Sequence, residues 1–272
     1  MINFAILYSK KDEAGMTIAE QLKKYFLPQV RIIEMKKDSI DEENIDERLE
    51  ELKNIDFIVF ATKHQSKEAR NTLSLHAPGN FRNADFGGKQ GKICSTSSLI
   101  LKYLFQKMQE NKEKFNLNYE LTLECTHHGP LIEKPCCFIE IGTTEEQWKD
   151  KKAAEVIAKT LVDLQEFDKW KIQENNKKIK SAIGIGGPHY CPNFNKIQLS
   201  NESRIAIGHI IPQYVLPLNE AMLKEALEKT KENTELVLLD WKGLGNSEER
   251  QKILSIIEKF GLISERTERI EK

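Results

Sequence analysis

Short apolar runs rich in β-branched residues alternate with longer amphipathic segments along this chain. Repeated strand and helix patterns favour an α/β fold with a mostly parallel or mixed central sheet sandwiched by helices. The predicted strands are Ile2–Tyr8, Val30–Met35, Asp56–Ala61, Tyr119–Cys125, Cys136–Ile141, Lys180–Ile185, Arg204–Ile210 and Glu235–Asp240, and the predicted helices are Glu13–Phe26, Ser95–Phe115, Glu145–Phe167, Glu220–Lys231 and Glu248–Phe260. In such sheets, ligands bind where strands end and loops begin.

The domain organisation follows from length and continuity. The 272 residues exceed the roughly 100–200 of a typical domain. One α/β domain of this size can still bury a sizeable core. Neither an internal repeat nor a low-complexity segment divides the chain, so residues 1–272 are predicted to form a single domain. The helix predicted over Glu145–Phe167 carries a capping-box signature, with Thr143 as its cap and Glu146 three residues later.

Composition excludes several classes of protein. The 41 basic and 42 acidic residues almost cancel, which argues against a strongly basic nucleic-acid binder but leaves room for a local basic surface. The five cysteines lack a CxxC pair and are odd in number, which favours reduced thiols in the cytoplasm over a disulfide scaffold or zinc finger. We expect neither a signal peptide nor a membrane span, because no apolar run approaches ~18 residues.

The histidines are the most informative residue type. All six fall at predicted strand ends or in turns containing glycine or proline, where catalytic groups of α/β proteins collect. They are His64, His76, His127, His128, His189 and His209. A single loop histidine is more often structural, but six in such positions predict that at least three share one site. Imidazole can bind zinc, transfer protons near neutral pH, or stabilise an oxyanion when charged.

The adjacent pair His127-His128 poses a geometric problem. In an extended strand, neighbouring side chains point to opposite faces. Gly129-Pro130 follows directly, so a turn is predicted there. We therefore expect one of the two histidines to face the site and the other to pack against it or support it.

Charged residues near these positions have two readings. Glu140 lies in an apolar strand, where an acid is costly to bury unless it is paired or binds a metal. It is either functional or bonded at an exposed strand end. Asp240 and Lys242 end the last strong strand; Asp240 is suited to orient a histidine and Lys242 to meet a phosphate. A surface ion pair is the more frequent role of such residues.

The glycine-rich segment after Lys180–Ile185 does not complete a nucleotide-binding motif. Gly184-Ile185-Gly186-Gly187 is followed by Pro188, and His189 occupies the last glycine position of a G-x-G-x-x-G fingerprint. Neither a phosphate loop nor a serine-nucleophile motif occurs. These glycines are predicted to allow close backbone approach to a ligand or a turn. Trp148, Trp170 and Tyr190 lie among lysine-rich runs, which indicates either an RNA track or solvated helix faces.

The ordered motifs resemble the archaeal and plant type of D-aminoacyl-tRNA deacylase over residues 1–265. The motifs are 126–130 (THHGP), 138–142 (FIEIG), 184–190 (GIGGPHY), 208–212 (GHIIP) and 240–243 (DWKG), and the segments around His64 and over 76–80 (HAPGN) also fit. Each motif alone is weak, but their order is specific. Pro188, Cys191 and the pair Cys136-Cys137 depart from the family pattern, which bears on local rigidity or metal preference and removes no histidine.

The resemblance implies hydrolysis of the ester between a D-amino acid and the terminal ribose of tRNA, two zinc ions per subunit, a monomer, and a fold similar to peptidyl-tRNA hydrolases and nucleoside phosphorylases. Under this hypothesis the catalytic residues are His127, His128, His189 and Glu140; the zinc ligands are His127, His128, His189 and His209; the substrate-binding residues are His64, His76, Asn80, Gly186, Gly187, His209 and Lys242. Zinc would activate water and polarise the ester carbonyl, and amides near Gly186-Gly187 would stabilise the oxyanion.

Two alternatives differ in class. One is a peptidyl-tRNA-type or other nucleoside-linked hydrolase that uses the same histidines. The other is a non-catalytic zinc-binding protein that interacts with RNA. The second is disfavoured because a structural zinc site usually recruits four closed ligands, often cysteines. Within the deacylase hypothesis, a histidine mechanism without protein-bound zinc is also open.

Overall fold

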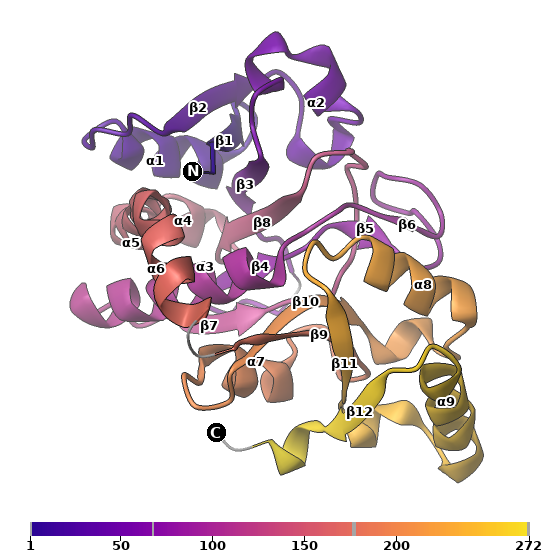
Figure 1. Cartoon of the computed structure of the whole chain (residues 1–272). Coiled ribbons are helices and arrows are strands. Elements are labelled where there is room, and N and C mark those ends of the chain that lie inside the picture. Colours follow the sequence, from indigo (N-terminus) through magenta and orange to yellow (C-terminus); the bar gives the residue numbers. More distant parts are fainter. Residues whose placement is uncertain (1, 67, 176–177, 271–272) are drawn as a thin grey trace.

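The computed structural model describes residues 2–66, 68–175 and 178–270, and most of their strands form two sheets (Figure 1). The first sheet has the strand order β2 (Val30–Met35), β1 (Phe4–Ser9), β3 (Phe57–Lys63), β8 (Cys136–Ile141), β4 (Thr72–His76) and β7 (Glu120–Leu123). The second has the order β10 (Ile205–Ile211), β9 (Lys180–Ile185), β11 (Thr234–Leu239) and β12 (Ile263–Arg266). A short ladder joins β5 (Gly79–Asn80) to β6 (Lys92–Ile93).

Strand directions confirm the predicted fold class. All pairings of the second sheet are parallel, and so are those of the first except β4 with β8. The division into two sheets is an addition to the prediction of one central sheet. Neither β4 nor β12 was predicted; each is short, and periodicity over so few residues is weak evidence.

Helices cover the sheets on their apolar faces. They are α1 (Glu13–Leu22), α2 (Ile45–Arg48), α3 (Ser98–Lys114), α4 (Glu145–Trp148), α5 (Lys151–Val162), α6 (Phe167–Asn175), α7 (Pro192–Leu199), α8 (Glu220–Glu228) and α9 (Ser247–Lys259). Buried residues of α1, α3 and α5 pack against the first sheet, and those of α8 and α9 against the second, at the lower right of Figure 1. Burial of these apolar surfaces is the main stabilising contribution.

Helix α3 links the two sheets. Its cap, Ser97, accepts a hydrogen bond from the backbone N–H of Ile100, and its first residue, Ser98, contacts Ser181 of β9 through their hydroxyls at 3.0 Å. Farther along, the buried Lys102 donates to the backbone carbonyls of Gln198 and Ser200 at the end of α7. One continuous core contains residues of both sheets, so the halves are packed together through α3.

The long helix predicted over Glu145–Phe167 is interrupted. Asp150 follows the short α4 and caps a new helix, because its carboxylate accepts hydrogen bonds from the backbone of Lys152 and Ala153. The capping box also lies one residue later than predicted. Thr144 is the cap, and Gln147 accepts a hydrogen bond from its backbone N–H.

Strand alternation divides the first sheet into an apolar and a partly polar face. Leu73 and Leu75 of β4, like Ile139 of β8, join the core beneath α1, α3 and α5. The residues between them face the other way, because successive side chains in a strand point to opposite faces. In register, Glu140 of β8 lies between Thr62 of β3 and Ser74 of β4 on this second face.

Candidate active site

Five histidines and two glutamates meet at the partly polar face of the first sheet, and we call them the histidine cluster. They come from the ends of β3, β4 and β7, from β8, and from the loop after β9. The members are His64, His76, Glu124, His127, His128, Glu140 and His189. The structure thus brings together five of the six histidines singled out from the sequence.

Glu140 is held at the centre of this face. It is only 3% exposed, and its two carboxylate oxygens accept hydrogen bonds from Thr62 Oγ1 at 2.9 Å and Ser74 Oγ at 3.2 Å. Its Oε2 lies 3.3 Å from His64 Nδ1 and 3.8 Å from His76 Nε2. A single buried carboxylate therefore touches two different parts of the cluster and fixes their relative positions.

Glu124 occupies the corresponding place at the end of β7. Its Oε2 lies 3.1 Å from His189 Nε2 and 3.5 Å from His127 Nε2. Its Oε1 lies 3.2 Å from His64 Nδ1 but has no hydrogen-bond partner. A buried carboxylate oxygen without a partner is costly unless another ligand satisfies it.

His127 and His128 point into the cluster together, contrary to the prediction that one would face the site and the other would pack behind it. His128 has a backbone φ of +46°, which breaks the strand alternation. The centroids of the two rings are 4.3 Å apart, and that of His76 lies 4.3 Å from His127 and 4.9 Å from His128. The three rings therefore line one space.

Hydrogen bonds to the backbone orient these three rings. The Nδ1 atoms of His76, His127 and His128 contact the carbonyl oxygens of Ala77 at 3.3 Å, Cys125 at 2.8 Å and Gly129 at 2.6 Å. Since a carbonyl oxygen can only accept, each Nδ1 carries the proton and each Nε2 keeps a free lone pair in the neutral ring. His76 Nε2 is buried without a hydrogen-bond partner.

His189 reaches the cluster from the glycine loop after β9. Gly186 and Gly187 have φ of +93° and +80°, and a Cβ on Gly187 would lie 2.9 Å from Asp240 Oδ2. The loop therefore requires glycine at this close approach. Gly186 N–H already donates to the Ile211 carbonyl, which argues against its predicted role as an oxyanion donor. Asp240 supports the loop and accepts a hydrogen bond from Asn193.

The electrostatic environment separates the protonation states within the cluster. Burial opposes ionisation of Glu140, but the neighbouring rings of His64 and His76 together outweigh it and hold its pKa well below the usual value. Burial and the neighbouring histidines lower the pKa of His127, and burial with His76 lowers that of His128 to about 4. Neutral rings beside ionised carboxylates are the forms that bind metal ions.

The second half of the cluster is more strongly charged. Burial disfavours the charged form of His189, but Cys125 and Glu124 outweigh it and raise its pKa to about 10. Burial opposes ionisation of Glu124, but the hydrogen bond with His189 and the neighbouring His64 and His76 together outweigh it and lower its pKa. The side chains of His127 and His189 are 23% and 31% exposed, whereas His64 and His76 are almost fully buried. An incoming ligand therefore meets His127 and His189 first.

Several sets of side chains in the cluster offer ligand atoms within 4.8 Å of one another. The sets are His76, His127 and His128; Cys125, His127 and His189; His64, Glu124 and His189; and His76, Glu124 and Glu140. We call the first set the first ligand group and the third set the second ligand group. Three or four nitrogen, oxygen or sulfur ligands are typical of zinc sites, so the donors fit zinc. The unpartnered His76 Nε2 and Glu124 Oε1 support this fit.

His209 lies outside the cluster, although we predicted it as a zinc ligand. Its Nδ1 contacts Thr126 Oγ1 at 3.0 Å and its Nε2 contacts the Lys229 carbonyl at 3.3 Å. With both ring nitrogens engaged, it lacks a lone pair for a metal. Its side chain is fully buried, and burial lowers its pKa to about 4, so it is a neutral structural residue at neutral pH.

The remaining predicted residues lie around the cluster. Asn80 donates a hydrogen bond to the Gly87 carbonyl and lines a cleft of about 210 Å³ next to His127. Lys242 is exposed in the turn Trp241–Leu244, beside the glycine loop rather than in the cluster. Trp148 donates a hydrogen bond to the backbone carbonyl of His64, and the hydroxyl of Tyr190 contacts His64 Nε2. Trp170 packs on Tyr103. These aromatic residues therefore have partners within the protein and do not form an exposed RNA-binding surface.

The site residues predicted from the sequence do not include Glu124, Thr62 or Cys125, all of which lie in or beside the cluster. Glu124 continues the alternation of β7, in which Glu120 and Thr122 precede it on the same face. This period of two could have marked it as a partner of Glu140. Cys125 Sγ lies 3.5 Å from His189 Nδ1 and 3.0 Å from the hydroxyl of Tyr214, a contact that the sequence does not indicate.

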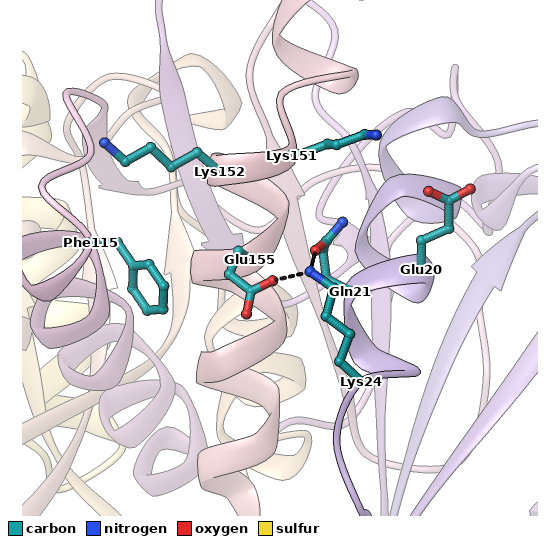
Figure 2. A pocket seen from close by; sticks show the side chains of 7 residues that line it. All are labelled: Glu20, Gln21, Lys24, Phe115, Lys151, Lys152 and Glu155. Carbon is teal, nitrogen blue, oxygen red and sulfur yellow. Dashed lines mark hydrogen bonds and ion pairs between the residues drawn. The ribbon is translucent and has the colours of Figure 1, made fainter.

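A larger hollow of about 600 Å³ lies far from these residues, between α1 and α5. Figure 2 shows its lysine and glutamate side chains spread over an open surface, with Lys24 directed at Glu155. Their ion pair is 3.0 Å long. The hollow contains neither histidine nor cysteine, so it lacks the groups expected of a hydrolytic centre.

Within the described part of the chain, no helix combines the length and the apolar character needed to cross a membrane.

Comparisons with known proteins identify relatives over most of the chain. The family model described as D-aminoacyl-tRNA deacylase matches residues 51–264. A D-aminoacyl-tRNA deacylase of Thermococcus onnurineus is 33% identical, over 94% of this chain and 97% of its own length. Its counterpart from Thermococcus kodakarensis is 36% identical over 76% of this chain and 72% of its own length. These matches extend across the cluster and both sheets.

A solved structure shares the fold. The crystal structure of AF0625, titled a conserved protein of unknown function, matches with a TM-score of 0.87 and 29% sequence identity. The match covers 99% of this chain and 96% of that one. The arrangement of the two sheets is therefore found in an experimental structure.

Proposed function

This chain belongs to the D-aminoacyl-tRNA deacylase family, and from that premise we propose how it hydrolyses its substrate. It is a hydrolase that cleaves the ester between a D-amino acid and the 3′-terminal ribose of tRNA, releasing the amino acid and the tRNA. The histidine cluster is the proposed active site, because it is the group of buried, mutually oriented titratable side chains that the matched region contains.

One observation carries the assignment of zinc. The rings of His76, His127 and His128 each place a backbone-bonded Nδ1 on the outside and leave Nε2 free. Such bonds to the far nitrogen are what orients metal-binding histidines in proteins. We propose that the first ligand group holds one zinc ion, and that the second ligand group holds the second ion that the family resemblance implies. His189 would release the proton that it holds beside Glu124 when zinc binds in the second group, because only the deprotonated ring can bind a metal.

Bound zinc would lower the pKa of a water molecule toward 7 and polarise the ester carbonyl. The protein's own residues position the partners of this chemistry. Glu140 touches His64 of the second ligand group and His76 of the first, so we assign it as a positioning residue for both. Glu124 orients His189 and His127, two partly exposed rings that we propose as the members that an ester reaches.

We also propose a compartment, an oligomeric state and a basis for selecting the D amino acid. The five cysteines are all free and buried, which fits a reducing compartment such as the cytoplasm. A monomer is proposed from the family resemblance alone. Selection of the D over the L amino acid is proposed to depend on pocket shape at Cα, because the wrong hand would direct its side chain into a wall or misplace the carbonyl.

Single-turnover deacylation tests the proposal. Wild-type protein is mixed with D-Tyr-tRNA, L-Tyr-tRNA or N-acetyl-D-Tyr-tRNA, before and after treatment with a chelator and after zinc is added back. We expect fast cleavage of the D ester only, loss with chelator, and recovery with zinc. Equal cleavage of the N-blocked ester would favour a peptidyl-tRNA-type hydrolase instead.

The remaining outcomes separate substrate from metal. D-selective cleavage by protein shown by metal analysis to be zinc-free would keep the substrate and reject the zinc assignment. Absence of cleavage of all three esters by folded, zinc-loaded protein would reject the deacylase proposal.

A further inference from the structure

Exposed aromatic side chains are few in this protein and are concentrated next to the cluster. Among the described residues, the large hydrophobic side chains that are at least one-third exposed are Met16, Phe26, Ile32, Phe86, Ile172, Tyr214 and Ile263. Three of these are aromatic. Two of the three, Phe86 and Tyr214, form hydrogen bonds with residues of the segment 124–129, which carries Glu124, His127 and His128. Exposed apolar groups at a site more often mark binding than folding.

Phe86 is exposed but its backbone is fixed. Its side chain is 70% exposed, whereas its carbonyl accepts a 2.8 Å hydrogen bond from the N–H of Gly129, directly after His128. The neighbouring Gly88 N–H donates to Glu43. The backbone that carries the ring is therefore held beside the cluster, so that little backbone entropy remains to be lost on binding.

Tyr214 is held beside the cluster by its hydroxyl group. Its side chain is 58% exposed, yet its hydroxyl lies 3.0 Å from Cys125 Sγ, whose sulfur also approaches His189. Arg82 ties the two segments together, since its guanidinium donates to the Val215 and Pro217 carbonyls. The loop over residues 81–88, which carries Phe86, is thus joined by hydrogen bonds to the segment of Tyr214. We call this loop and the segment 214–217 the rim.

The cleft of about 210 Å³ lies within this rim. Its lining includes Asn83 and Asp85 from the segment before Phe86, as well as His127 and Tyr214. The volume is below the roughly 300 Å³ of drug-sized sites, which suits one ring system rather than a strand. Among the lining residues, the positive charge of Arg82 is balanced by the negative charge of Asp85, so the cleft has no excess positive charge to attract a phosphate group. An uncharged flat ligand with hydrogen-bonding edges fits better.

We propose that Tyr214 and Phe86 are stacking surfaces for the unpaired 3′ end of tRNA, with the terminal nucleoside in the cleft against Tyr214. The inference rests on the proposed function. If the scissile ester lies at His127 and His189, the ribose and base bonded to it must occupy an adjacent space, and the cleft shares His127 with the cluster. Unpaired bases commonly stack on aromatic side chains, which recognise the flat faces that all bases share.

Equilibrium binding of uncharged tRNA tests this without any need for catalysis. Fluorescence anisotropy compares full-length tRNA with the same tRNA lacking its terminal adenosine, on the zinc-loaded full chain. We expect Tyr214→Leu and Phe86→Leu each to weaken binding of full-length tRNA on the order of tenfold, since leucine keeps apolar bulk but removes the ring. Tyr214→Phe, which keeps the ring and loses the contact with Cys125, should bind nearly as wild type.

The two tRNAs and a matched control make the result specific. Tyr214→Leu should hardly affect binding of the truncated tRNA, because its partner is then missing. Phe26→Leu is the control, since Phe26 is 86% exposed but precedes β2, at the edge of the first sheet opposite β7. Equal weakening of both tRNAs by Tyr214→Leu, or an effect of Phe26→Leu as large as that of Phe86→Leu, would overturn the proposal.

A second measurement separates the base from the amino acid as occupant of the cleft. If Tyr214 stacks on the nucleoside, Tyr214→Leu should lower kcat/KM for D-Ala-tRNA and D-Tyr-tRNA by the same factor. A change confined to D-Tyr-tRNA, with unchanged binding of uncharged tRNA, would assign the cleft to the amino-acid side chain and overturn our inference. Failure of the proposed function itself would appear separately, as absent hydrolysis by wild-type protein that still binds tRNA.

Discussion

The histidine cluster and the hollow between α1 and α5 are both lined by titratable side chains, but these side chains have different interaction partners in the two regions. In the hollow, Lys24 and Glu155 form an ion pair at the surface, with the lysine side chain 59% exposed. In the cluster, His76 Nε2 and Glu124 Oε1 are buried without hydrogen-bond partners. The hollow is the larger space, so size is a poor guide to chemistry here. The better guide is the gathering of several buried metal-binding side chains in one place, two of whose atoms lack hydrogen-bond partners.

The same comparison applies within the set of histidines. His209 has hydrogen bonds to both ring nitrogens, whereas His76, His127 and His128 each have one nitrogen bonded and one free. Accounting for each ring nitrogen therefore distinguishes His209 from the three rings of the first ligand group, whereas the ring nitrogens of His64 and His189 contact other side chains, among them the carboxylate of Glu124, which would share a bound metal with them. The following substitutions are expected to separate these regions, in order of decreasing effect.

Replacing Glu140 should have the largest effect, because it contacts both ligand groups. Glu140→Gln preserves shape but removes the charge beside His64 and His76. We expect the single-turnover rate to fall by about 100-fold, the upper end of the range for residues that orient metal ligands, because Glu140 orients a ligand of each group. Zinc content should fall as well. Activity within a few-fold of wild type, in folded protein, would contradict the central place of Glu140.

Removing a hydroxyl that supports Glu140 should have an intermediate effect. Thr62→Val is nearly isosteric and deletes the 2.9 Å hydrogen bond to Glu140 Oε1. Outer partners of this kind typically contribute about 10–100-fold to metal affinity or activity. Zinc titration and deacylation rates check the prediction. Thr17→Val is a control, because that hydroxyl bonds only the Glu13 carbonyl within α1, and its loss should leave both quantities unchanged.

Replacing His209 should reduce stability and leave zinc in place. His209→Gln disrupts the contacts with Thr126 and Lys229. An unsatisfied buried polar group costs about 1–3 kcal/mol, so the free energy of unfolding should decrease by that order. Denaturant titration measures this change, and metal analysis should find wild-type zinc content. Loss of zinc from folded His209→Gln protein would return this residue to the ligand set.

The same residue predicts a pH dependence of stability. Burial lowers its folded-state pKa to about 4, below the unfolded value near 6.5. The folded state therefore disfavours the charged ring, and this contribution is fully present above pH 6.5 and is lost as pH falls through 4. The loss amounts to about 3 kcal/mol. The free energy of unfolding should decrease more between pH 7 and pH 4.5 for wild type than for His209→Gln. Parallel profiles would contradict the neutral, buried assignment.

Substitution in the hollow should have the smallest effect. Lys24→Ala removes an ion pair with Glu155 in which the lysine is well solvated. Exposed ion pairs contribute about 0–1 kcal/mol, so the unfolding free energy should change by less than about 0.5 kcal/mol. The deacylation rate should equal that of wild type. A large loss of activity would show that the hollow takes part in substrate binding after all.

The sequence predicted the type of most elements of this fold because their periodicity is strong. It also placed five of the cluster histidines at strand ends or loops, where the structure has them. It could not exclude His209, because the bonds to Thr126 and Lys229 join residues far apart in the chain. The joint approach of His127 and His128 depends on a positive φ at His128, which residue patterns do not predict for histidine.

Other features of the site required the fold. Thr62 reaches Glu140 only because β3 and β8 are neighbours in the sheet, which the order of strands along the chain does not reveal. The exposure of Phe86 and Tyr214 likewise follows from tertiary contacts that fix their backbone or hydroxyl and leave the rings outside. Glu124 was within reach of sequence reasoning, since it extends the polar face of β7.

Zinc content is the measurement that tests the central claim most directly. Purified wild type, His127→Gln, His189→Gln and His209→Gln are loaded with zinc, exchanged into metal-free buffer and analysed by mass spectrometry alongside a thermal unfolding control. The account predicts two ions per chain for wild type and His209→Gln, and a lower content when either cluster residue is replaced. Folded wild type without zinc, or a loss of zinc confined to His209→Gln, would contradict it.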